Sequence, residues 1–176
     1  MARPVEYMRA DAARNVHRIV AVAARLLGDD PGAGMADVAA AAEVSRATVY
    51  RHFPTREALI AAIHAQAFEL AQQTLQDAAL DQGSATDALR RLIPAWLALV
   101  ERYAFVERPE PDPERKHVLK APLLALFERG EFRTPAEWSV RAFGALLLAG
   151  AKAVNDGALT RDEAADLIFN TLTEGL

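Results

Sequence analysis

Apolar residues recur at helical spacings of three and four along most of this 176-residue chain. In the window 11–27, for example, Val16, Ile19 and Ala23 share one face, and Arg18 lies off it. No window shows the alternation of Val, Ile and Thr, bounded by turn residues, that a half-buried β-strand requires. We therefore expect an all-α protein of about nine helices.

The composition limits the chemistry that is open to the chain. The sequence has no cysteine, which excludes thiol catalysis, disulfide scaffolds and cysteine-based metal sites. No apolar run approaches the roughly 18 residues of a membrane span, and residues 1–10 lack the apolar stretch of a secretory signal. We expect a cytoplasmic protein that does not bind membranes.

Charge is distributed unevenly along the chain, although the net charge of −4 is small. Residues 1–56 carry eight arginines against six acidic residues, a net charge of +2, whereas residues 57–176 carry a net charge of −6. Because nucleic acid attracts positive charge, any surface that binds it is expected in the first third of the chain.

Turn residues divide this first third into a long helix and two short ones. Gly28 ends the first helix, a short alanine-rich helix follows over 35–42, and another opens at Ser45, a favourable N-cap, and ends before Pro54. This is the layout of a helix-turn-helix inside a three-helix domain. We expect a flexible arm over 1–10, a helix-turn-helix domain over 11–56 and a larger helical domain over 57–176.

The segment 44–56, VSRATVYRHFPTR, contains three arginines and no acidic residue. At about 100° per residue, Val49 and Phe53 share the inward face, so that Ala47 and Arg51 point away from the core. Small residues permit close approach to DNA, arginine can read guanine, and threonine can contact thymine. This face is therefore a candidate DNA-reading surface.

The run from residue 37 to residue 60 resembles the DNA-binding signature of the TetR family of transcriptional regulators. The resemblance implies an N-terminal helix-turn-helix domain followed by a C-terminal domain that dimerises and binds a small effector. It also implies roles for individual residues in the complex with DNA. Arg46, Ala47, Thr48 and Arg51 would face bases, Tyr50 and His52 would hold the DNA backbone, and Arg56 would hold a further phosphate.

Two positions depart from the family pattern. Glu43 stands where the family usually has glycine, at a turn that calls for a positive φ, and we expect either a strain of about 1 kcal/mol there or a slightly altered turn. Residues 34–36, Gly-Met-Ala, replace threonines that often contact a phosphate. Neither departure lies on the expected DNA-reading face.

The last two expected helices, 136–155 and 160–173, carry apolar stripes, and the first of them has a second face of small residues. The family resemblance implies that these two helices pair with the same two helices of a second subunit. The alternative is that both are ordinary core helices. The expected dimer interface consists of Val140, Phe143, Leu147, Gly150, Val154, Leu167, Ile168 and Leu172.

Aromatic residues are concentrated in the C-terminal part of the chain. They could line an effector cavity between helices, although an aromatic residue at helical spacing also serves simply as core. The candidate cavity residues are Phe68, Trp96, Tyr103, Phe105, Phe127 and Trp138.

We therefore expect a sequence-specific DNA-binding transcriptional regulator, a homodimeric repressor that a small-molecule effector releases from a palindromic double-stranded operator. The alternative is a protein of the same fold without small-molecule input, regulated by its abundance or by a protein partner that docks on the proline-rich segment 109–113. The four histidines are scattered and no nucleophile has an adjacent base, so we expect no enzymatic activity and no cofactor.

Overall fold

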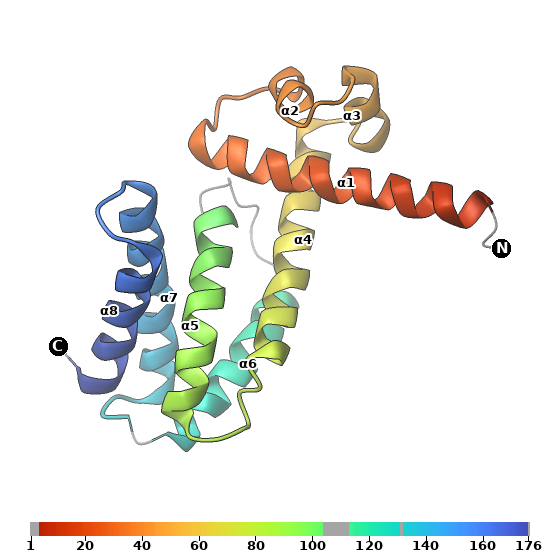
Figure 1. Ribbon diagram of the computed structural model, residues 1–176. Coiled ribbons are helices and arrows are strands. Elements are labelled where there is room, and N and C mark those ends of the chain that lie inside the picture. The colour runs from red at the N-terminus through yellow and green to blue at the C-terminus, as the bar shows by residue number, and fades with distance from the viewer. Residues whose placement is uncertain (1–3, 104–112, 131, 176) are drawn as a thin grey trace. The chain divides into compact units, whose positions relative to one another are not determined.

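The computed structural model describes residues 4–103, 113–130 and 132–175, with side chains from residue 15 onward. These residues form eight helices (Figure 1), close to the nine expected, and no strand, which the periodicity predicts. The chain divides after Gln66 into two compact units, so the boundary lies within the fourth helix, further along than residue 56. The helices are α1 (Pro4–Asp29), α2 (Met35–Ala41), α3 (Arg46–His52), α4 (Arg56–Asp77), α5 (Ala85–Tyr103), α6 (Pro113–Arg129), α7 (Ala136–Asn155) and α8 (Arg161–Glu174).

The first unit holds α1, α2, α3 and the start of α4. Helix α2 packs against both α1 and α3 (Figure 1), and the core of this unit includes Ile19, Val38 and Leu59, each at most 1% exposed. Gly34 is the N-cap of α2, and its backbone N–H donates to the Asp37 carboxylate at 2.8 Å. Helix α1 begins at Pro4, so most of the expected flexible arm over 1–10 is helical.

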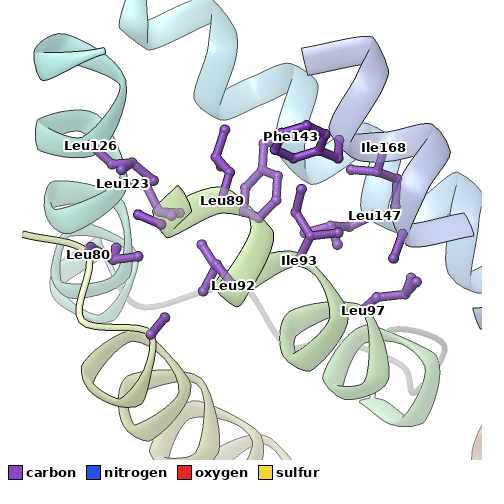
Figure 2. Packing of buried hydrophobic residues seen from close by; sticks show 14 of the residues in the cluster. Leu80, Leu89, Leu92, Ile93, Leu97, Leu123, Leu126, Phe143, Leu147 and Ile168 are labelled. Atoms are coloured by element: carbon purple, nitrogen blue, oxygen red, sulfur yellow. The ribbon is translucent and has the colours of Figure 1, made fainter. Parts of the chain in front are cut away.

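The second unit packs α5, α6, α7 and α8 around one apolar core. Helix α5 contacts α7 and α8, and α6 lies against α7. Figure 2 shows Leu89, Ile93 and Leu97 of α5 pointing toward residues of α6, α7 and α8. At the surface of this unit, the Arg161 guanidinium makes a forked ion pair with Glu101, which ties α8 to α5 with a shortest distance of 2.7 Å.

Two arginines hold the loop between α4 and α5. Arg91 donates to the carbonyls of Ala78, Ala79 and Gln82 at 2.8–3.0 Å, and Arg129 donates to those of Leu80 and Gly83. Ala79 has a φ of 45°. The arginines therefore supply donors to backbone carbonyls of this loop, which lie outside the helical hydrogen-bond pattern.

Among the described residues, no helix is long and apolar enough to cross a membrane. Helix α6 begins at Pro113, a residue that is well tolerated in a first helical turn. The rest of the proline-rich segment 109–113 lies outside the described residues, so its role as a docking site stays a prediction.

Candidate DNA-binding site

Helix α3 starts with a side-chain cap. The Ser45 hydroxyl accepts the backbone N–H of Thr48 at 3.1 Å, while the Ser45 backbone is extended, with a ψ of 148°. The two hydroxyls, Ser45 Oγ and Thr48 Oγ1, also lie within hydrogen-bond distance, at 2.8 Å. The cap therefore fixes where α3 begins and which side chains its first turn presents.

The inner face of α3 anchors the helix to the first unit. Val49 is fully buried and Phe53, which follows the helix, is 5% exposed. The backbone N–H of Phe53 bonds to the Val49 carbonyl at 2.8 Å, which closes the last turn. The inward face predicted from the sequence is thus confirmed.

The opposite face of α3 is open to solvent and carries positive charge. Arg46, Ala47 and Arg51 are exposed, and Tyr50 is 50% exposed. Thr48 and His52 are half-buried, with the His52 ring tilted against Phe53. An exposed, acid-free helix of this kind can enter the major groove, where arginine reads guanine and tyrosine reaches a phosphate.

The turn between α2 and α3 contains the predicted strained residue. Glu43 has a φ of 54°, in the left-handed region. Its N–H bonds to the Ala40 carbonyl at 3.1 Å, and the N–H of Val44 bonds to the Ala39 carbonyl at 3.0 Å. This pair of bonds defines a Schellman motif, with Glu43 at the position that glycine usually occupies. The positive φ expected there is confirmed.

Arg56 has a structural role that the sequence pattern did not indicate. Its Nη1 donates to the Ala33 carbonyl at 2.6 Å and its Nη2 to the Pro31 carbonyl at 2.7 Å. These bonds join the first turn of α4 to the loop before α2. Two of the five N–H donors of the guanidinium are therefore engaged within the protein, and the phosphate contact of Arg56 stays a prediction.

The expected effector residues do not form one group. Phe127 is 3% exposed and packs on Phe132 and Phe143, so it fills the core, and Trp138 is 62% exposed, so it lines no interior cavity. Both assignments are corrected. Phe105 lies outside the described residues.

Three of the aromatic residues keep features suited to a ligand site. Phe68 lies half-buried under the Arg115 guanidinium, at 5.1 Å from the ring centroid, and Trp96 is half-buried beside Phe143. Tyr103 is 5% exposed, and within the described part of the chain its hydroxyl has no hydrogen-bond partner. Burial raises the pKa of this phenol.

The expected dimer interface is corrected for four of its eight residues. Phe143, Leu147 and Ile168 are at most 3% exposed and belong to the core of their own unit, as Figure 2 shows. Gly150 is also buried, and a Cβ added there would lie 2.9 Å from Ile168 Cδ1. Helical spacing revealed two apolar faces but not which of them faces inward. Val140, Val154 and Leu172 are half-buried against the core, and Leu167 alone of the eight is exposed.

A capped recognition helix on a three-helix scaffold, followed by a helical domain, defines a helix-turn-helix protein. The family model of bacterial regulatory proteins of the tetR family matches residues 19–63. The chain is also 33% identical, over 93% of its length and 90% of the relative, to the HTH-type transcriptional repressor LfrR of Mycolicibacterium smegmatis. It therefore belongs to the tetR family and is a DNA-binding regulator.

Solved structures agree with this assignment. The crystal structure of LfrR from Mycobacterium smegmatis in complex with proflavine matches with a TM-score of 0.77 and 32% identity, covering 93% of this chain and 97% of that one. The regulator PfmR from Thermus thermophilus matches with a TM-score of 0.71, covering 90% and 98%; at 23% identity it supports the fold alone. Both relatives are transcriptional regulators.

Proposed function

We propose that the protein is a homodimeric repressor that binds a palindromic operator through helix α3 and leaves it when a small molecule binds the second unit. The exposed, acid-free face of α3, with Arg46 and Arg51 held by the Ser45 cap and the buried Val49, is the observation that carries this proposal. In such dimers the half-sites lie about 34–36 Å apart, or a multiple of that distance.

Selection of bound fragments from a random DNA pool tests the proposal. The expected result is a palindrome that the wild-type protein enriches strongly and Arg51→Ala enriches much less. Arg133→Ala is the matched control, because it removes one exposed arginine from the loop between α6 and α7. Enrichment by Arg51→Ala as strong as that by the wild type, or no enrichment with any variant, would reject DNA reading by α3.

An exposed stripe on α7 supports dimerisation. Trp138, Arg141, Ala145, Leu148 and Lys152 recur at spacings of three and four, and all are exposed. Gly144 lies beside them, with open space beyond its own helix where a Cβ would be. Glycine in an exposed helix costs about 1 kcal/mol relative to alanine, so an open glycine here favours close approach of a second helix.

Helix α8 offers a stripe of complementary charge. Leu167 is 54% exposed, with the exposed residues Glu163, Asp166 and Asn170 around it. A two-fold interface is self-complementary, so α8 of one subunit can meet α7 of the other. Acidic α8 residues would then face the basic Arg141 and Lys152 stripe.

Sedimentation of charge-introducing variants tests this interface. Leu148→Asp and Leu167→Asp are expected to yield monomers and to weaken binding to the selected palindrome. Leu70→Asp is the control, because Leu70 is 38% exposed, close to the 43% of Leu148, but lies on α4. Dimers that persist in both interface variants would place the interface elsewhere.

For the effector, we propose a planar aromatic cation. The match to a relative solved with proflavine supports this class, as do the half-buried Trp96 and the net charge of −6 over residues 57–176. The buried Tyr103 hydroxyl, which has no hydrogen-bond partner among the described residues, supports it as well. A buried hydroxyl without a partner costs about 1–3 kcal/mol, and a ligand that bonds to it recovers part of that cost.

Proflavine is the probe for this part of the proposal. We expect saturable binding by fluorescence titration and weaker binding of the selected palindrome when proflavine is present. Tyr103→Phe is expected to unfold at a higher temperature without ligand and to bind proflavine less tightly. If proflavine does not alter DNA affinity, the effector class is wrong while operator binding stands.

A further inference from the structure

Thr48 is the one residue of the DNA-reading face whose hydroxyl bonds to the cap of its own helix. Its Oγ1 lies 2.8 Å from Ser45 Oγ, and the same serine oxygen accepts the Thr48 N–H at 3.1 Å. Two links thus join the same pair of residues. They turn the Thr48 hydroxyl back toward the start of α3.

The carbon that bears this hydroxyl has one other heavy-atom branch, a methyl group. With the hydroxyl directed at Ser45, the methyl is the branch left to meet a base edge. Thr48 is partly exposed and stands directly after the exposed Ala47, at the N-terminal end of the helix. Residues at this end of a recognition helix contact base edges in the major groove.

We propose that Thr48 determines specificity through its methyl group, by packing against the 5-methyl group of a thymine in each operator half-site. An apolar contact with this methyl distinguishes thymine from the other three natural bases in the major groove. The inference rests on the proposed function, because it requires that α3 reads DNA.

The test replaces each thymine of the selected palindrome in turn by deoxyuridine, which removes only the 5-methyl group. One thymine in each half-site is expected to be sensitive. Replacing it by deoxyuridine is expected to weaken binding of the wild-type protein about fourfold for each half-site changed, which corresponds to the loss of one buried methyl group. Thr48→Val keeps a methyl branch without the hydroxyl, and it is expected to retain both the affinity and the sensitivity to deoxyuridine. Thr48→Ser keeps the hydroxyl, and it is expected to bind the two duplexes equally.

Three results would overturn the proposal. One is that no thymine position is sensitive to loss of its methyl group, and another is that Thr48→Ser retains the sensitivity, which would assign the contact to another residue such as Ala47. The third is that Thr48→Val loses as much affinity as Thr48→Ala, which would assign the DNA contact to the hydroxyl. A failure of the proposed function itself is distinguishable, since then no palindrome is enriched at all.

Discussion

Two accounts of Arg56, in the first turn of α4, make different predictions. The family resemblance gives it a phosphate contact, whereas the structure gives its guanidinium two backbone carbonyls, those of Pro31 and Ala33, at 2.7 and 2.6 Å. The substitution Arg56→Lys distinguishes the accounts. Lysine keeps the charge that a phosphate needs, but it lacks the planar fork that reaches two carbonyls.

The expected loss of stability depends on whether water can reach each carbonyl once the guanidinium is removed. Pro31 is exposed, so its carbonyl turns to water at small cost. Ala33 is 4% exposed, and leaving a buried acceptor unsatisfied costs about 1–3 kcal/mol. We therefore expect Arg56→Met to lower the free energy of unfolding by about 2 kcal/mol, and Arg56→Lys by somewhat less. For a chain of this size, 2 kcal/mol lowers Tm by about 4–8 °C.

Thermal unfolding and the salt dependence of operator binding give the two readouts. If Arg56 serves as a structural link, Arg56→Lys lowers Tm, and Arg56→Met leaves the slope of log affinity against log salt unchanged. A phosphate contact instead predicts a slope about 0.9 smaller per contact with Arg56→Met, and nearly normal behaviour with Arg56→Lys. A smaller slope without a fall in Tm would refute the structural account.

Three further predictions concern single residues. Glu43→Gly relieves the left-handed strain and is expected to raise the free energy of unfolding by about 0.5–1 kcal/mol, whereas Glu43→Ala is not; denaturant titration checks both. Arg91→Met removes three carbonyl bonds and is expected to lower Tm by several degrees, with Arg133→Met as the unaffected control. Bonds from the backbone and hydroxyl of Thr160 lower the pKa of Glu163, so this stabilisation is present above the ordinary glutamate pKa and is lost as pH falls through the lower folded value. Glu163→Gln is therefore expected to flatten the fall of the unfolding free energy between about pH 5 and pH 3, measured by urea titration; an unchanged slope would contradict the assignment.

Local signals in the sequence predicted the first unit well. The Ser45 cap, Pro54 and the inward pair Val49 and Phe53 each act within one or two turns of helix, so their effects can be read from neighbouring residues. The strain at Glu43 was predictable for the same reason, because a turn imposes its φ on whichever residue stands there.

The features that were missed depend on contacts between distant parts of the chain. The bonds from Arg56 to Pro31 and Ala33 span more than twenty residues, and those from Arg129 to the loop before α5 span more than forty. The side of α7 that faces inward is likewise decided by α5 and α8. Periodicity identified the apolar stripe that contains Phe143, but it could not show that this stripe is core.

The most direct test of DNA reading by α3 is equilibrium binding of the selected palindrome and of a shuffled duplex, at one salt concentration, by fluorescence anisotropy. The wild type and Arg133→Ala are expected to prefer the palindrome by at least about 1,000-fold. Arg51→Ala is expected to lose about ten- to hundredfold of that preference, as the loss of one bidentate base contact would produce. Equal preference in Arg51→Ala and Arg133→Ala would contradict the account.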